Sequence, residues 1–299
     1  MFNESIAKIN DLKVNVVAIL NDTTGTLVKG RYDDPNCCIG LILGTGCNGA
    51  YLEKAERISN WENDSNAKQV IVDPEFGAFG DNGCIDFIKT EFDQAIDSSS
   101  LLPKSFTYEK YFAGKYIGEL ARLVLLKLHQ KELLFSGKST KLDEAGIFSS
   151  SDLSDIEQDA FDATRVFESL SLNGTYAKTK EIFTKLGLPA NEKISKSDLV
   201  IVQYVCKVLS ERCGVLVGVP LAVFLDRIGR NEGECGIAVT GSLYKHHPRL
   251  KMVLEKYIGK NLKNKNIKFY TFLSDDGSGK GAGLVAAIAN RLKYTSIRQ

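Results

Sequence analysis

Short runs of aliphatic and β-branched residues alternate along the chain with longer segments whose apolar residues recur every three or four positions. Runs of the first kind, bounded by glycine and polar residues, are typical of strands. They occur at Val14–Leu20, Gly40–Leu43, Val70–Val72, Ile237–Val239 and Lys268–Leu273. Strands that alternate with helices indicate an α/β fold.

Segments with helical spacing separate these runs. The clearest is the amphipathic pattern from Ile117 to Leu128. Three further helices are predicted, over residues 1–12, over Leu199–Val208 and over Ala282–Leu292. The intervening region, roughly residues 136–200, is acidic and is also expected to be mostly helical.

Charge and hydropathy exclude two classes of partner. The chain of 299 residues has 38 Lys and Arg against 37 Asp and Glu, a net charge of +1. Such a balance lacks the basic footprint of a nucleic-acid-coating protein. The longest uncharged apolar stretch, Cys213–Leu225, is shorter than the roughly 20 residues that a membrane-spanning helix needs, and we expect Pro220 to interrupt it. We therefore expect no nucleic-acid partner and no membrane span.

Seven cysteines and three histidines limit the redox and metal chemistry. No two cysteines have the CxxC spacing of a zinc or redox site. An odd number of thiols in a chain of this length is typical of reduced, mostly buried cysteines in a cytoplasmic protein. Three histidines are too few to favour a histidine-based metal site or catalytic triad, so we expect no metal bound by protein ligands alone.

Four polar, glycine-containing turns follow predicted strands, which is where ligands gather in α/β proteins. They are Asn21–Thr26, Gly44–Asn48, Thr240–Ser242 and Gly277–Gly281. Their glycines let main-chain N–H groups approach a phosphate or a sugar closely. The last turn opens a helix, whose N-terminus favours an anion, but it matches neither the Walker A nor the dinucleotide-binding spacing.

Each of these features also has a purely structural interpretation. Asp22 is either a rigidly held general base for a hydroxyl or a residue that ends a strand. Gly44–Asn48 also fits an ordinary β-hairpin turn, and Gly277–Gly281 fits close packing between helices. Pattern alone would assign Glu75 and Glu109 to the surface, although Glu75 precedes an apolar run. Together, the turns and the Asp, Asn and Glu side chains predict a phosphotransferase or a sugar-binding α/β protein.

Six stretches, in order, closely resemble the hexokinase/glucokinase family. They read VVAILNDTTGTL, YDDPNCCIGLILGTGCNGAYLE, PEFGAFGDNGCIDFIKTEFDQAID, YEKYFAGKYIGELARLVL, VTGSLYKHHP and FLSDDGSGKGAGLVAA. The resemblance covers nearly the whole chain. It implies the actin-like, ribonuclease-H-like ATPase fold, with two lobes around a cleft. It also implies transfer of the γ-phosphoryl group of ATP to the 6-hydroxyl of a glucose-like hexose, with Mg²⁺ bound mainly through ATP.

The resemblance assigns roles to individual residues. The general base would be Asp22. The residues that bind the sugar hydroxyls would be Asn21, Asn48, Glu75 and Glu109. Positions on the nucleotide side would be Thr45, Gly114, Lys115, Ser150, Ser151, Ser154, Thr240, Gly241, Ser242, Gly277 and Gly279. The family usually has Asp where this chain has Thr240.

The resemblance covers the large lobe of the family and a C-terminal helix. The family's Asp-x-Gly-Gly-Thr-Asn phosphate loop, a Leu-Pro-rich sugar-binding stretch and a Thr-Lys pair are not found in this sequence. We therefore expect residues 1–276 to form a large lobe and residues 277–299 to form a hinge and helix. Without a small lobe, residues 282–292 should expose an apolar stripe.

Two functions remain open on this basis. The chain is either an ATP:hexose phosphotransferase, inactive alone if a small lobe is required, or a non-catalytic sugar-binding or scaffold module derived from one. Its partners would be a hexose, ATP and either further copies of the chain or a chain that supplies a small lobe. Another kinase of the same fold superfamily is less favoured, because the Asn-Asp-Thr and Glu-Phe-Gly-Ala-Phe-Gly-Asp strings match the hexokinase pattern.

Overall fold

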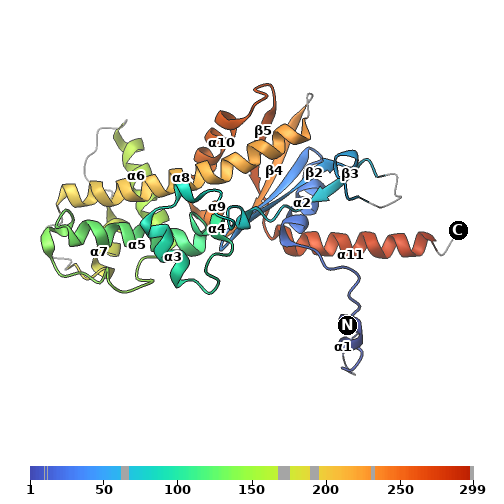
Figure 1. The fold of residues 1–299 in the computed structure, drawn as a ribbon, viewed down its shortest axis with the longest axis horizontal. Helices are drawn as coiled ribbons and strands as arrows, with labels where there is room; N and C mark the ends of the chain where they lie inside the picture. The colour runs from blue at the N-terminus through green and yellow to red at the C-terminus, as the bar shows by residue number, and fades with distance from the viewer. Residues whose placement is uncertain are drawn as a thin grey trace.

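One mixed five-stranded sheet organises the protein (Figure 1). The computed structural model describes residues 1–9, 11, 13–61, 67–167, 176–188, 195–229 and 233–296. The strand order is β3-β2-β1-β4-β5; the pairs β1–β2 and β2–β3 are antiparallel, and β1–β4 and β4–β5 are parallel. The strands are β1 Cys37–Leu43, β2 Cys47–Lys54, β3 Gln69–Val72, β4 Glu234–Thr240 and β5 Lys268–Leu273.

Helices cover the sheet, and further helices form a layer beyond the carboxyl ends of β1 and β4 (Figure 1). The α-helices of the described residues are α1 Phe2–Ile6, α2 Asp22–Asp33, α3 Glu91–Ser99, α4 Thr107–Lys110, α5 Gly114–Gln130, α6 Ser150–Phe167, α7 Ala177–Lys185, α8 Lys196–Ile228, α9 Ser242–His246, α10 Leu250–Asn261 and α11 Gly277–Ser296. Short 3₁₀ helices are η1 Ala55–Arg57, η2 Phe76–Ala78, η3 Asp86–Ile88 and η4 Phe135–Gly137.

Different helices cover the two faces of the sheet. Leu27 of α2 belongs to the same small buried cluster as Ala50 of β2. The next residue of β2, Tyr51, stacks on Phe224 of α8 with ring centroids 4.6 Å apart. Because successive side chains of a strand point to opposite faces, α2 and α8 lie on opposite sides of the sheet.

The long helix α8 continues through Pro220, so the prediction that this proline interrupts the apolar stretch was wrong. Proline lacks the N–H that would bond to the carbonyl four residues earlier, which in α8 belongs to Leu216. The hydroxyl of Tyr108, buried on α4, donates to that Leu216 carbonyl over 2.6 Å. A side chain thus satisfies the acceptor that Pro220 leaves free, and the bond ties α4 to the centre of α8.

The prediction that no segment is long enough to span a membrane needs the same correction. By length and composition alone, α8 is long and apolar enough to do so. Within the most apolar 18-residue stretch of α8, 56% is buried inside the protein. There α8 packs on α10 and β2. Central helices of a protein core share these properties, so α8 is weak evidence for a membrane span.

Four of the five predicted strands are confirmed, and Val14–Leu20 is the exception. This segment has no strand partner in the described structure and is mostly exposed; the side chain of Asn3 bonds the main chain of Val16 over 2.7 and 2.9 Å. β-Branched residues favour extended backbone, but a strand also requires a paired neighbour. The predicted N-terminal helix is confirmed only for Phe2–Ile6, and Leu12 lies outside the described residues.

The last helix, α11, packs on α2 through glycine and then extends past the sheet (Figure 1). A Cβ atom on Gly281 would overlap the carbonyl group of Gly25 in α2. Farther along, Ile288 and Leu292 are 54% and 65% exposed. The predicted apolar stripe is therefore confirmed in the second half of residues 282–292, whereas Leu284 is half-buried. The division of the chain at residue 276 stays a prediction.

The helix contact at Gly281 predicts opposite effects for two neighbouring glycines. Gly281→Ala should lower the free energy of unfolding by about 1–3 kcal/mol, because the added methyl group must push α11 away from α2. Gly283→Ala is the matched control: nothing lies within 4 Å of its added Cβ, and alanine in a helix is favoured by roughly 0.5–1 kcal/mol. Urea unfolding measures both variants. Equal stability of the two would contradict the described packing of α11.

Candidate functional site

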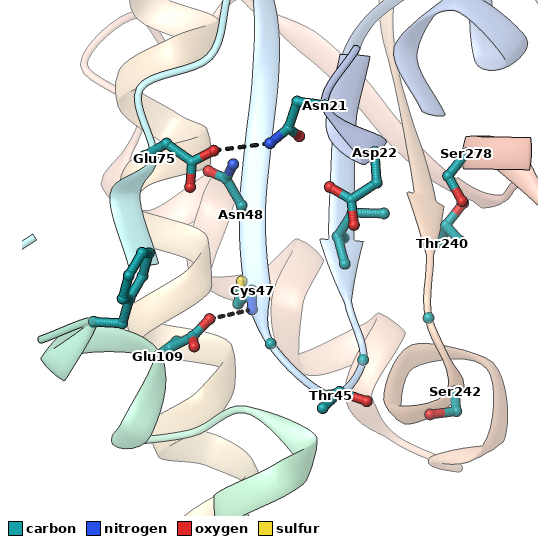
Figure 2. Close-up of a pocket in the computed structure, with 15 residues that line it drawn as sticks. Asn21, Asp22, Thr45, Cys47, Asn48, Glu75, Glu109, Thr240, Ser242 and Ser278 are labelled. Carbon is teal, nitrogen blue, oxygen red and sulfur yellow. Dashed lines mark hydrogen bonds between the residues drawn. The ribbon is translucent and has the colours of Figure 1, made fainter. Parts of the chain in front are cut away.

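A cavity of about 510 Å³ opens where β1 and β4 end and the helices α2 and α11 begin (Figure 2). Nine of the predicted site residues line it, namely Asn21, Asp22, Thr45, Asn48, Glu75, Glu109, Thr240, Gly241 and Ser242. Four further lining residues, Gly44, Gly46, Cys47 and Ser278, belong to the predicted turns, whereas Ile42 and Phe106 lie outside every predicted part of the site. Segments more than 250 residues apart in the chain thus meet in one cavity.

Asp22 is the first residue of α2, not the end of a strand as predicted. Asn21 is the N-cap: its side-chain oxygen accepts hydrogen bonds from the N–H of Thr23 over 2.8 Å and from its hydroxyl over 2.6 Å. This cap ends the extended segment and starts the helix, so that Asp22 faces the cavity (Figure 2). Within the described part of the chain, no hydrogen bond or ion pair engages its carboxylate, which leaves both oxygens for a ligand.

Glu75 and Asn48 reach the cavity from β2 and from the segment that follows β3. Glu75 has a left-handed backbone conformation with φ of 49°, which is uncommon for a residue other than glycine. Its Oε1 accepts a hydrogen bond from Asn21 Nδ2 over 2.8 Å. Asn48 Nδ2 donates to Asp73 Oδ1 over 2.7 Å. Figure 2 shows Asn21, Asn48 and Glu75 together on one side of Asp22.

Two contacts hold Glu109 in the cavity, one at the start of the helix that carries it and one at its carboxylate. The carboxylate of Asp81 accepts the N–H groups of Phe106 and Thr107 over 2.9 and 2.8 Å and thereby caps the start of α4. Glu109, two residues further, then accepts the N–H of Cys47 at its Oε2 over 2.9 Å. Long-range capping of a one-turn helix therefore places a carboxylate that the local sequence pattern did not mark.

The cavity wall is anionic on this side. Glu75, Glu109 and Asp22 line it, and none of the described lining residues is Lys or Arg. Burial raises the pKa of Glu75, and the nearby carboxylates of Asp73, Asp22 and Glu109 raise it further. Burial likewise raises the pKa of Glu109, although the N–H of Cys47 opposes this effect. Carboxylates accept hydrogen bonds from neutral hydroxyl groups and repel anions, so this side of the cavity suits a neutral polyhydroxy ligand better than a phosphate.

The opposite side of the cavity carries hydroxyl and main-chain groups (Figure 2). Gly241, with φ of 143°, lies so close to β1 that a Cβ would overlap the carbonyl of Leu43. This contact lets Thr240 and Ser242 flank the cavity. Thr240 Oγ1 donates to the carbonyl of Ser274 over 2.7 Å, and Ser278 lines the cavity from the first turn of α11. Helix N-termini and small hydroxyl residues are suited to phosphate oxygens.

The predicted serines of α6 lie beside this wall. Ser150, Ser151 and Ser154 line a second cavity of about 160 Å³ with Asp155, Leu243 and His246. Ser242 lines both cavities, so the two adjoin at the start of α9. The structure thus brings these serines next to the side of the main cavity that carries Thr240, Ser242 and Ser278, although they do not line that cavity.

Four further predicted residues do not line the cavity. The N–H groups of Gly114 and Lys115 donate to the carbonyls of Gly44 and Thr45 over 2.8 and 3.1 Å and hold the β1–β2 turn. The ammonium group of Lys115 lies 5.5 Å from the ring centroid of Tyr116, in a separate cavity. The other two residues, Gly277 and Gly279, are glycines with no room for a side chain. A Cβ on Gly277 would lie 2.5 Å from Thr240 Oγ1, and one on Gly279 would lie 2.6 Å from Asp276 Oδ1.

No group of three or more His, Cys, Asp or Glu side chains among the described residues could hold a metal ion. The carboxylates of the main cavity are engaged with Asn and main-chain N–H groups or lie singly.

Comparisons with known proteins identify similar chains. A sequence profile of the family described as Hexokinase matches residues 38–288. Human Hexokinase-1 is 39% identical over 297 residues, which is 98% of this chain and 30% of that protein. Human Hexokinase-2 is 39% identical over 303 residues, 100% of this chain and 31% of that protein. The chain thus spans about 30% of the length of these relatives.

Solved structures confirm the fold. A hexokinase from Schistosoma mansoni, complexed with glucose, superimposes with a TM-score of 0.81 at 35% identity, covering 96% of this chain and 60% of that one. A second hexokinase structure has a TM-score of 0.72 at 26% identity and covers 94% and 56% of the two chains. The predicted actin-like α/β fold, with a mixed sheet flanked by helices, is therefore confirmed.

Proposed function

Since the chain belongs to the hexokinase family, we propose that it transfers the γ-phosphoryl group of ATP to the 6-hydroxyl of a glucose-like hexose. The observation that carries this proposal is the division of the main cavity (Figure 2). Amides and carboxylates that suit a polyhydroxy compound lie on one side, hydroxyl and main-chain groups that suit phosphates lie on the other, and Asp22 lies between them.

The side of the cavity formed by Asn21, Asn48, Glu75 and Glu109, here called the sugar side, offers both hydrogen-bond donors and acceptors. Glu75 and Glu109 accept hydrogen bonds from sugar hydroxyls, because each has a carboxylate oxygen beyond the one already bonded to Asn21 or Cys47. Asn21 and Asn48 each keep one amide N–H after their bonds to Glu75 and Asp73 and donate it to a hydroxyl oxygen. Fixed donors and acceptors of both kinds distinguish a hexose from an apolar ligand of equal size.

Asp22 is assigned as the general base. It accepts the proton of the 6-hydroxyl while that oxygen bonds to the γ-phosphorus, and the bond to the bridging oxygen breaks as ADP leaves with its electron pair. The transition state of such transfers is loose, so that most of the rate comes from alignment and from charge stabilisation. The carboxylate of Asp22, at the first residue of α2, accepts no hydrogen bond from the described residues and is thus available for this late proton transfer.

The donor set also fits MgATP. Phosphate oxygens would meet the Gly44–Gly46 turn, Thr240 to Ser242 and Ser278 of α11, and none of these lining residues is a cation. Mg²⁺ bound to the phosphates would supply the missing positive charge. The odd number of cysteines, none of them in a CxxC pair, supports the proposal of a reducing, cytoplasmic location.

Direct sugar binding tests the proposal. We expect isothermal titration to show binding of D-glucose and no binding of L-glucose. Asn48→Ala should weaken the affinity for D-glucose by about tenfold, the loss of one buried hydrogen bond. Asn266→Ala, which removes an exposed amide after α10, is the matched control and should bind as the wild type does. Absence of binding for every D-hexose at millimolar concentrations would refute the proposal.

A further inference from the structure

Hydrogen bonds of the sugar side converge on a carboxylate that does not itself line the cavity. Asp73 follows β3 directly and is half-buried. Its Oδ1 accepts Asn48 Nδ2 over 2.7 Å and the N–H of Glu75 over 3.3 Å. One oxygen atom therefore holds two of the residues assigned to the hexose, one through its side chain and one through its main chain.

We propose that Asp73 is a positioning residue that fixes the Asn48 amide and the Glu75 backbone in the orientation that binds the hexose. The inference rests on the proposed function of the cavity. Asp73 touches no reacting atom and acts only through its two neighbours.

The effect on Asn48 follows from the two ends of its amide. Asn48 Oδ1 accepts the N–H of Gly49 over 2.8 Å, and Nδ2 donates to Asp73. A carboxylate accepts but cannot donate, so the Asp73 contact excludes the flipped amide, in which Oδ1 would face it. The remaining N–H and the remaining lone pair of Asn48 thus point in defined directions into the cavity. Fixing a polar group before the ligand arrives lowers the cost of ordering it on binding.

The effect on Glu75 is on its main chain. Left-handed backbone at a residue other than glycine costs free energy and persists only when its surroundings hold it. The Asp73 carboxylate accepts the N–H of Glu75, Pro74 restricts the backbone between them, and Asn21 bonds the carboxylate end. Asp73, Glu75 and Asn21 therefore form one chain of hydrogen bonds from β3 to the N-terminus of α2.

The same contact has a consequence for pH dependence. The charged groups that face Glu75 are Asp73 on its own segment, Asp22 on α2 and Glu109 on α4, and all three raise its pKa after burial has done so. A raised pKa means that, as the pH falls, Glu75 loses its negative charge earlier than an ordinary glutamate would. Removal of the Asp73 charge lowers that pKa, so the loss of sugar binding should move to lower pH.

Two substitutions separate geometry from charge. In Asp73→Asn, the amide oxygen still accepts from Asn48 and Glu75, but the charge is gone. We expect nearly wild-type affinity for D-glucose at neutral pH and an acid limb displaced to lower pH. In Asp73→Ala both bonds are lost, and the dissociation constant should rise by about tenfold or more. Titration calorimetry from acidic to neutral pH measures both, and Glu56→Gln, an exposed acid on η1, is the control.

A sugar-free measurement keeps this inference separate from the proposed function. In protein labelled with ¹⁵N-asparagine, the Asn48 amide protons, assigned by their absence in Asn48→Ser, should be protected from exchange in the wild type. We expect that protection in Asp73→Asn and its loss in Asp73→Ala. Unchanged Asn48 signals and an unchanged acid limb in both folded variants would overturn the role of Asp73. Wild-type protection of Asn48 without binding of any hexose would refute the proposed function alone.

Discussion

Replacing Asp22 with alanine should lower the rate of hexose 6-phosphate formation by about 10²–10⁴-fold, the usual contribution of a positioned general base. The carboxylate is the group of the main cavity that lies between the sugar side and the phosphate side (Figure 2). The loss should appear in kcat, because Asn48, Glu75 and Glu109 still hold the sugar. A coupled assay of D-glucose and MgATP measures the rate, and calorimetry measures the sugar affinity.

Asp33→Ala is the control for this experiment. Asp33 is the last residue of the same helix, on which it pairs with Lys29 at the surface. Its removal changes the net charge and the composition of α2 in the same way, and we expect the rate to stay within about twofold, since surface pairs contribute little. Equal rates for wild type and Asp22→Ala would show that Asp22 is not the base or that a contaminating kinase supplies the activity.

The sequence predicted the turns of the site better than it predicted the elements that bear them. Gly44–Asn48 is both a hairpin turn, between β1 and β2, and a wall of the cavity, so the two interpretations were not exclusive. Thr240–Ser242 likewise follows a strand as predicted. Glycine-rich turns can be recognised locally because the backbone conformation that they need restricts the residue type.

Asn21 and Asp22 show where the pattern of apolar residues was misleading. The run Val14–Leu20 has the composition of a strand, and Asp22 was therefore placed at a strand end. The opposing signal was present: Asn followed by an acidic residue is a typical helix N-cap and first turn. The apolar run could not decide the matter, since only a paired neighbour makes a strand.

Other parts of the site could not be read from local sequence. Glu109 faces the cavity because Asp81, 28 residues earlier in the chain, caps α4. Tyr108 is anchored by a carbonyl that Pro220 frees more than 100 residues later. Such placements depend on tertiary contacts, and the resemblance to a known family identified Glu109 where residue pattern alone assigned it to the surface.

Loss of the carboxylate of Asp93 should be among the most destabilising single changes in this protein. The side chain is 0% exposed and accepts two hydrogen bonds from the guanidinium group of Arg212 in α8, over 2.7 and 2.8 Å. It also caps α3 by accepting from the N–H and hydroxyl of Thr90 over 2.8 and 2.7 Å. Removing one partner of a buried pair costs about 3–5 kcal/mol. We therefore expect Asp93→Ala to lower the free energy of unfolding by that amount, measured in urea.

Glu91→Ala is the matched control, because Glu91 lies in the same first turn of α3 but is 63% exposed in its pair with Lys127. Both substitutions remove a negative charge from the N-terminus of α3, so the interaction with the helix dipole is lost in each. The control should cost no more than about 1 kcal/mol. If the two variants were equally stable, the Asp93–Arg212 contact would contribute nothing to the stability with which α3 is joined to α8.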